Sequence, residues 1–298
     1  MKPTIICAYV FLLLTISCSS PKDSAVEAED WISLFNQKDL TGWDIKIAGY
    51  AMNDNFKNTF QVNDSILSVS YNDYDTFTNE FGHLYYNQPY SYYRVRLQYR
   101  FYGEQKKGGP DYARLNSGLM VHSQSAKSLV LHQSFPVSLE MQFLASDSAR
   151  QSHTGNLCTP GTEFEQNGKL VDVHCLDSDS KYYDEDVWVN AEVIVLGDSI
   201  IHHVINGDTV LTYEHPTVDR HLTNRFMNWN KEDAADSIQW MQKQGTPLTE
   251  GYIALQAESH PIEFRKIELL NLKGCMDPKA LNYKSYYKKA DNTLCQYK

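Results

Sequence analysis

Residues 187–213, VWVNAEVIVLGDSIIHHVINGDTVLTY, contain three apolar runs separated by two tight-turn signals. In the first run, apolar residues at every second position alternate with residues such as Asn190 and Glu192, which is the period of a strand with one buried face. Gly197-Asp198 and Asn206-Gly207 separate the runs, and Asn-Gly suits a type I′ turn because both central residues need a positive φ. The stretch therefore predicts a three-stranded antiparallel meander.

Strand patterns also dominate the rest of the chain. Apolar and polar residues alternate along Tyr93–Phe101 and along Val137–Phe143. Further strands are predicted at Trp31–Phe35, Thr59–Val62, Ile66–Tyr71, Leu84–Tyr86, Gly118–His122, Tyr252–Ala257 and Ile262–Leu272. Helix signals are sparse, and the best of them is Lys231–Gln244. About a dozen antiparallel strands with long loops predict an all-β sandwich.

Composition and charge narrow the classes of function. The chain has 298 residues, of which 42% are hydrophobic and 21% charged, an ordinary globular composition. Its net charge of −10 argues against a general nucleic-acid binder, which needs a basic surface to displace phosphate counterions. The motifs of serine hydrolases (G-x-S-x-G), zincins (H-E-x-x-H), Walker-loop enzymes and dinucleotide-binding enzymes (G-x-G-x-x-G) are all missing from the sequence.

The N-terminus has the pattern of an export signal. A basic second residue precedes the apolar run Ile5–Ile16, which is too short to span a bilayer. Ser17 directly before Cys18 resembles the cleavage site of bacterial lipoproteins. We therefore expect a signal peptide at residues 1–17, lipidation of Cys18 and a polar tether over residues 18–30, with plain secretion as the alternative. The expected location is the bacterial cell envelope, periplasm or cell surface, with membrane contact through the lipid alone.

Four cysteines remain after these assignments: Cys158, Cys175, Cys275 and Cys295. An even number in an exported chain predicts two disulfides. Of the three connectivities we favour the local pairs, and a zinc site is the alternative, although the chain has no C-x-x-C pair. The second local pair would close a small C-terminal appendix, residues 273–298, that has too little apolar content to fold without it. The sandwich is then expected to occupy residues 31–272.

Two pairs of polar residues are candidates for a site on the outer face of the sandwich. Glu140 and Gln142 are two residues apart, so they point the same way, while their neighbours point into the core. Gln256 and Glu258 have the same spacing. If the two strands are close in the sheet, carboxylates and amides converge on one surface; a solvated polar face is the alternative.

Other polar and aromatic residues join these candidates. His122 ends a predicted strand, and His203 precedes the Asn-Gly turn, where a hydrogen-bonded strand-end histidine is the alternative. Arg265 could pair with Glu258 or bind a sugar hydroxyl group, and a plain surface arginine is the alternative. Trp229 lies in a polar insertion and could stack on a sugar ring.

Several motifs together resemble the 3-keto-disaccharide hydrolase family. They are WISLFNQKDLTGW at residues 31–43, NSGLM at 116–120, FPVSLEMQ at 135–142, TGNLCTPGT at 154–162, HVING at 203–207, and GYIALQAE at 251–258 followed by FRKI at 264–267. TGNLCTPGT is similar to the cysteine-bearing branch of Bacteroidota-type lipoproteins. The resemblance covers about Trp31 to Leu272. The sequence departs from the family pattern at Gln37, where Gly is usual, and at Lys266, where Asn is usual. His122 also lies near a position where the family commonly has Arg.

The resemblance implies a concanavalin-like jelly-roll sandwich that acts on 3-keto-glycosides. A base would remove the C2 proton that the C3 ketone acidifies, the C1 aglycone would leave by β-elimination, and water would then add. We assign Glu140 or Glu258 as the base and His203 as a possible acid. The expected substrate-binding residues are Gln142, Gln256, Arg265, His122 and Trp229.

The sequence requires no cofactor, although a divalent cation could stabilise the enolate. A non-catalytic, lectin-like carbohydrate-binding sandwich is the main alternative to an enzyme. A two-carboxylate glycosidase that cleaves unoxidised glycosides is the third possibility.

Overall fold

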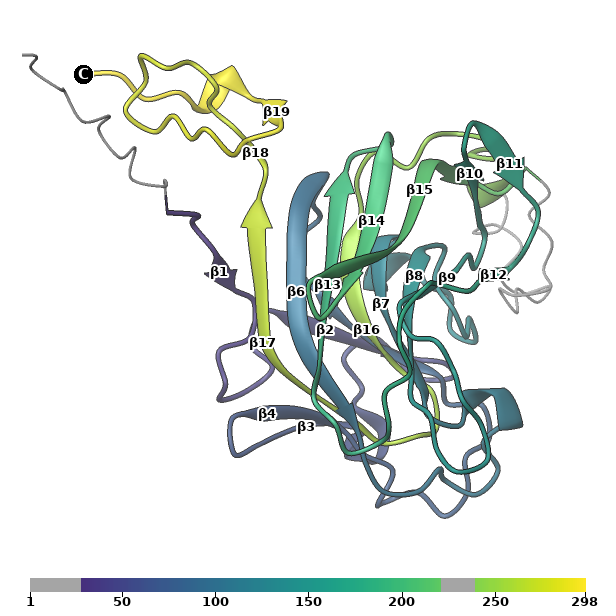
Figure 1. Cartoon of the computed structure of the whole chain (residues 1–298). Coiled ribbons are helices and arrows are strands. Elements are labelled where there is room, and N and C mark those ends of the chain that lie inside the picture. Colours follow the sequence, from purple (N-terminus) through teal and green to yellow (C-terminus); the bar gives the residue numbers. More distant parts are fainter. Residues whose placement is uncertain (1–27, 221–238) are drawn as a thin grey trace, which may run out of the picture.

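The computed structural model describes residues 28–220 and 239–298, and two antiparallel β-sheets form its framework (Figure 1). The larger sheet has the order β11-β10-β15-β14-β13-β6-β17-β4-β3, with β1 paired to β17. Its strands are β1 (Ile32–Ser33), β3 (Phe60–Asn63), β4 (Ile66–Val69), β6 (Tyr92–Phe101), β10 (Thr162–Gln166), β11 (Lys169–Val171), β13 (Val189–Leu196), β14 (Ile200–Ile205), β15 (Asp208–Val218) and β17 (Ile262–Asn271).

The smaller sheet has the order β12-β9-β8-β7-β16-β5-β2 and packs against the larger one. Its strands are β2 (Trp43–Ile47), β5 (Gly82–Tyr86), β7 (Asn116–Ser123), β8 (Leu139–Leu144), β9 (Asn156–Cys158), β12 (Cys175–Leu176) and β16 (Tyr252–Ala257). Short 3₁₀ turns η1 (Phe56–Asn58), η2 (Asp111–Ala113) and η3 (Ala126–Ser128) lie in the loops. This arrangement confirms the predicted all-β jelly-roll sandwich.

The core lies between the two sheets and follows the alternation in the sequence. Along β6 every second residue is buried and the residues between them are partly exposed. Across the core, the rings of Tyr99 on β6 and Phe143 on β8 stack with their centroids 4.2 Å apart. Burial of this kind contributes roughly 25 cal/mol for each Å² of apolar surface removed from water, and it ties the two sheets together.

The predicted meander is confirmed, because β13, β14 and β15 pair in sequence order. Asn206 and Gly207 in its second turn have φ angles of 49° and 92°, both positive as a type I′ turn requires. The strand predicted from Val137 begins only at Leu139, since the Val137 and Ser138 amides donate to the Gln124 side chain and to the Pro160 carbonyl.

Most of the predicted helix Lys231–Gln244 falls on residues 221–238, which lie outside the described residues. The part that is described begins with one helical turn at residues 239–241. In residues 28–220 and 239–298, no helix is long and apolar enough to cross a bilayer. The expected signal peptide and lipidated Cys18 also lie outside the described residues and stay predictions.

Both predicted disulfides, Cys158–Cys175 and Cys275–Cys295, are present, which removes the zinc alternative for these cysteines. The second closes a C-terminal module, residues 273–298, that projects from the sandwich beyond the end of β17 (Figure 1). In this module β18 (Lys273–Gly274) pairs with β19 (Lys289–Ala290), and the turn η5 (Asn292–Leu294) follows.

Candidate functional site

The register of the smaller sheet brings the predicted carboxylate and amide pairs together. β8 and β16 both pair with β7, so these three strands lie side by side. Gly118 pairs with Gln142, and the Leu119–Leu255 pair places Gln256 beside Gly118 on its other side. Because side chains alternate along a strand, Gln142 and Gln256 flank Gly118 on the outer face of the sheet.

Gly118 makes room for the Glu140 side chain. A Cβ atom built on Gly118 would lie 2.6 Å from Cγ of Glu140, a distance that no real side chain tolerates. The carboxylate therefore lies across the middle strand, where it accepts a hydrogen bond from the Gln256 side chain. A glycine in a strand interior costs stability, and here it marks a close approach that a larger residue would block.

A pocket of about 510 Å³ lies on this face of the smaller sheet. Glu140, Gln142 and Glu258 line it together. The remaining lining residues are three aromatic side chains, a disulfide and a group of neighbouring polar or small side chains: Phe81, Tyr112, Phe135, Cys158–Cys175, Asn79, Asn116, Ser134, Pro160 and His174. Apolar rings and a few converging polar groups are typical of a site for a small polar ligand.

The two carboxyl groups in the pocket resist ionisation. Glu140 is 6% and Glu258 3% exposed, and burial raises the pKa of Glu140 to about 8, with the hydrogen bond from Gln256 acting in the opposite direction. Burial raises the pKa of Glu258 well above its ordinary range, and the negative charge of Glu140 adds to this increase. Because the two groups repel each other when both are charged, the pair retains at least one proton at neutral pH.

Two buried acceptors at the site are left without a hydrogen-bond partner among the described residues. They are Oδ1 of Asn116, whose Nδ2 donates to the Tyr112 carbonyl, and Oε1 of Gln256. An unpaired buried acceptor typically costs about 1–3 kcal/mol. A ligand with hydroxyl groups would supply the missing donors.

The structure does not bring His203 to the pocket. His203 lies on β14 of the larger sheet and is fully buried, with Nδ1 2.8 Å from the Gly155 carbonyl oxygen and Nε2 3.2 Å from the Tyr213 hydroxyl. Burial lowers its pKa to about 4, so the ring is neutral at physiological pH. These contacts are those of the hydrogen-bonded strand-end histidine that the sequence left as an alternative.

His122 is also turned away from the carboxylates. The β7–β16 register shifts between Tyr252 and Ala254, and His122 has a φ of 48° beside this irregularity. Its Nε2 lies 2.9 Å from the Gly197 carbonyl oxygen, in the turn between β13 and β14. The local irregularity breaks the alternation on which the prediction rested, so the ring contacts the larger sheet.

Arg265 lies on β17 of the larger sheet. Its Nε donates to Oε1 of Gln98 at 2.7 Å, and its guanidinium carbon lies 3.9 Å from the ring centroid of Trp188. It is not among the pocket residues and forms no pair with Glu258. Trp229 lies outside the described residues.

Pocket residues that the sequence argument missed come mainly from loops. Tyr112, Phe135 and His174 belong to no strand, and their sequence positions carry no periodic signal. The Cys158–Cys175 pair could have indicated His174, because a disulfide on the strand next to Glu140 holds the adjacent residue at the same site. Within the described ranges, no three His, Cys, Asp or Glu side chains form a group that could hold a metal ion. The divalent cation therefore stays a prediction.

Comparison with known proteins gives a family and a set of distant structural likenesses. Curated proteins yield no match. Among solved structures, a candidate glycosyl hydrolase from Parabacteroides distasonis is 16% identical, with 81% of this chain and 94% of that chain covered and a TM-score of 0.46. A Bacillus subtilis protein of unknown function with a galectin-like fold is 11% identical, with coverages of 81% and 94% and a TM-score of 0.47.

A Bacillus subtilis carbohydrate-binding module is 9% identical, with coverages of 78% and 96% and a TM-score of 0.40. The more specific finding is a family model described as a 3-keto-alpha-glucoside-1,2-lyase-like domain, which matches residues 30–270. These residues include both sheets and every residue of the pocket. The chain therefore belongs to the 3-keto-alpha-glucoside-1,2-lyase-like domain family.

Proposed function

We propose that this protein is an exported enzyme that cleaves 3-keto-glycosides by C2 proton abstraction and β-elimination, followed by hydration. Family membership supports a carbohydrate ligand. The observation that carries the proposal is the pair of buried carboxyl groups, Glu140 and Glu258, in one pocket beside amide side chains.

The two carboxyl groups suit the two proton transfers of this reaction. Glu140 is the base, since the hydrogen bond from Gln256 stabilises its carboxylate form. It removes the C2 proton, and the electron pair forms the C1–C2 double bond as the C1–O bond breaks. Glu258, which burial keeps protonated, gives its proton to the departing aglycone oxygen.

Hydration restores both groups. The eliminated sugar is an enone, and water attacks it at C1 while the Glu258 carboxylate accepts the proton of that water. Glu140 returns its proton to C2, so the products are the free 3-keto sugar and the aglycone. Gln142 and Asn116 both line the pocket, and in the proposed mechanism Gln142 and the unpaired acceptor of Asn116 hold sugar hydroxyl groups.

Replacement of either carboxyl group tests the assignment. Glu140→Gln and Glu258→Gln should each lower the rate of elimination from a 3-keto-glucoside at least about tenfold, since a positioned acid or base contributes about 10²–10⁴-fold. Glu268→Gln, in β17 of the opposite sheet, is the matched control and should keep the parent rate. If both pocket variants fold and their elimination rates are unchanged, the proposal is wrong.

The same pocket also suits a lectin-like protein, since unpaired acceptors and aromatic walls bind sugars without chemistry. Paired oxidised and unoxidised nitrophenyl glucosides separate the candidates. A 3-keto-glycoside lyase releases nitrophenol only from the oxidised compound, and an ordinary two-carboxylate glycosidase releases it from the unoxidised one. A lectin binds saturably and releases none, whichever carboxyl group is replaced.

Export and lipidation of Cys18 belong to the same proposal. The two disulfides support a compartment outside the cytosol, where thiols oxidise. Labelling of bacterial cells with a radioactive fatty acid should mark the parent protein and leave the Cys18→Ser variant unmarked. Equal labelling of both would assign the acyl group to another position.

A further inference from the structure

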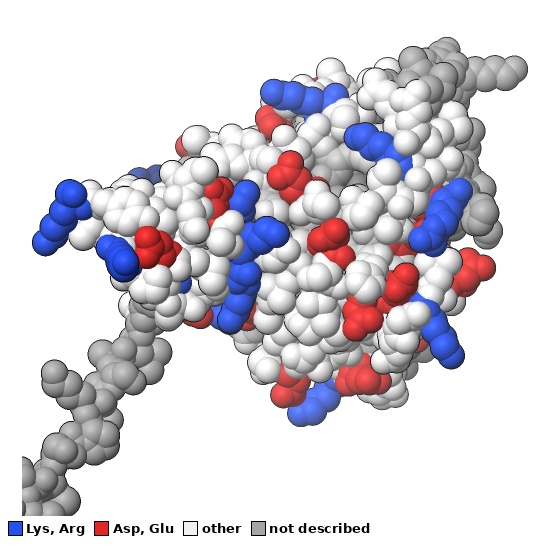
Figure 2. Space-filling view, turned by 90° about the horizontal axis from the view of Figure 1, so that it is seen from above, with Lys and Arg blue, Asp and Glu red and all other residues white. Residues whose placement is uncertain are grey.

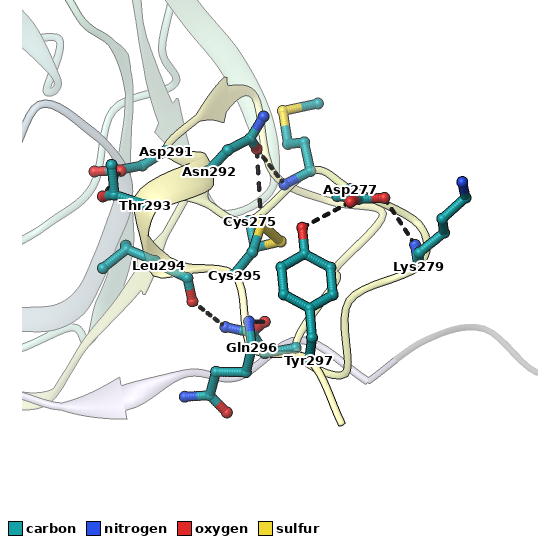
Figure 3. The surroundings of a disulfide bond; sticks show 12 residues. Cys275, Asp277, Lys279, Asp291, Asn292, Thr293, Leu294, Cys295, Gln296 and Tyr297 are labelled. Atoms are coloured by element: carbon teal, nitrogen blue, oxygen red, sulfur yellow. Dashed lines mark hydrogen bonds between the residues drawn. A yellow bond between two sulfur atoms is a disulfide. The ribbon is translucent and has the colours of Figure 1, made fainter.

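The C-terminal module, residues 273–298, is a compact unit with a fixed shape. The Leu281 amide donates to the Gln296 carbonyl at 2.8 Å, and Nδ2 of Asn282 donates to the Leu294 carbonyl at 2.8 Å. Figure 3 shows the carboxylate of Asp277 accepting from the Tyr297 hydroxyl, at 2.7 Å, beside the Cys275–Cys295 disulfide. The surface of the module is therefore set by these contacts.

The module is basic, whereas the rest of the protein is acidic. Its residues include six Lys and two Asp, so its net charge is +4. Since the whole chain has a net charge of −10, residues 1–272 have a net charge of −14. Lys279, Lys288 and Lys298 are exposed. Such a contrast of charge within one chain marks a surface for an anionic partner.

The module also exposes large apolar side chains. Met276, Leu281, Leu294 and Tyr297 are 40%, 62%, 52% and 59% exposed. They are four of the twelve large hydrophobic residues that are exposed among the described residues, although the module is less than a tenth of the chain. The hydrogen bonds above hold the Leu281 and Leu294 segments close together, so exposed apolar side chains and exposed lysines belong to one small folded unit.

The module lies beside the start of the described chain. The carboxylate of Asp30 is 2.8 Å from Nζ of Lys284 and accepts a hydrogen bond from the Tyr286 hydroxyl at 3.2 Å. Figure 1 shows the module next to this N-terminal segment, and Figure 2, seen from that end, shows Lys or Arg side chains on the projecting part. A segment that leads to a membrane anchor would thus bring the module to the bilayer surface.

We propose that the C-terminal module binds an anionic lipid surface. Its lysines attract lipid phosphate groups, and its exposed Leu, Met and Tyr side chains enter the interfacial region, where aromatic and apolar side chains are favoured next to basic ones. A lipid chain combined with a basic patch holds a protein far longer than either contact does alone. The proposal does not depend on the enzymatic function of the pocket.

The test uses the mature chain, residues 18–298, with Cys18→Ser, so that neither the apolar signal peptide nor an acyl group contributes. This protein should sediment with vesicles of phosphatidylcholine and phosphatidylglycerol, and not with phosphatidylcholine alone, and the binding should weaken with salt. The variant Lys279→Glu/Lys288→Glu/Lys298→Glu should bind at least about tenfold more weakly. Lys38→Glu/Lys57→Glu/Lys169→Glu changes the net charge equally on the sandwich and should retain the binding.

Leu281→Ser/Leu294→Ser should also weaken vesicle binding, most clearly at high salt, where the electrostatic attraction is screened. A thiol titration that finds no free cysteine from the Cys275–Cys295 pair shows that each variant keeps its fold. Binding that is insensitive to salt, or equal losses in the module and sandwich variants, would overturn the proposal. Binding to soluble polygalacturonate without binding to vesicles would assign the module to an anionic glycan instead.

Discussion

At the scale of single residues, the two buried glutamates carry a cost in stability that the proposed chemistry requires. Glu140 and Glu258 lie in a pocket where burial opposes their charged forms. Groups with no catalytic role rarely remain in such a position, because an apolar or amide residue would be more stable there. The burial of these two carboxyl groups therefore supports the proposed function of the pocket.

The pH dependence of stability follows from the raised pKa of Glu140, about 8 in the fold against an ordinary value of 4.5. Below about pH 4.5 both the folded and unfolded states hold the proton, so the group has no effect on stability. As the pH rises toward 8, only the unfolded chain ionises freely, and the free energy of unfolding falls.

Glu140→Gln should remove this loss. The variant should be more stable than the parent by about 4 kcal/mol at pH 8 and nearly equal to it near pH 4.5, since each unit of raised pKa corresponds to about 1.4 kcal/mol. Thermal unfolding at the two pH values measures the difference. A variant that is destabilised to the same extent at both would show that the carboxyl group is not desolvated in the fold.

Gly118→Ala should harm the site through contact with Glu140. The added methyl group would collide with that side chain, so we expect a loss of about 1–3 kcal/mol in stability and a fall in activity. In a background of Glu140→Ala the same substitution should cost much less, because the collision is gone. Additive losses in the double variant, measured by denaturant unfolding, would place the strain elsewhere.

At the scale of elements, the disulfide between β9 and β12 forms part of the pocket wall. Cys158→Ala/Cys175→Ala should cost about 3 kcal/mol, from a crosslink that spans 17 residues, and should raise KM more than it lowers kcat. Cys275→Ala/Cys295→Ala is the control, since that disulfide lies in the projecting module and should leave KM unchanged. If steady-state kinetics show the same change in KM for both double variants, the Cys158–Cys175 disulfide is not part of the site.

The success of strand prediction varied with the length and regularity of the element. β6 and β13 are long, keep a strict two-residue period, and lie where their sequence patterns predict. β9 and β12 have two or three residues each, too few for a period, and hydrogen bonds to neighbouring strands define them. The irregularity at His122 shows the same limit, because one backbone angle reverses the direction that the alternation predicts.

At the scale of the whole molecule, the larger sheet supports the site without contributing to it. The stacked rings of Tyr99 and Phe143 fix β8 from the inner side, while Glu140 and Gln142 project from its outer side. His203 and Arg265 belong to the larger sheet, which explains their separation from the pocket. Catalytic geometry held on a packed sheet is more rigid than geometry held on loops.

The amino-acid sequence alone predicted the sandwich, the two disulfides and the four polar side chains on β8 and at β16. These predictions depend on the two-residue period of the strands, on the number of cysteines and on short motifs, all of which can be read without knowing which distant residues are in contact. The sequence did not indicate which strands lie side by side, which loops wall the pocket, or that the C-terminal module meets Asp30. Those contacts join residues far apart in sequence, and packing of the two sheets selects them from many arrangements with the same local patterns.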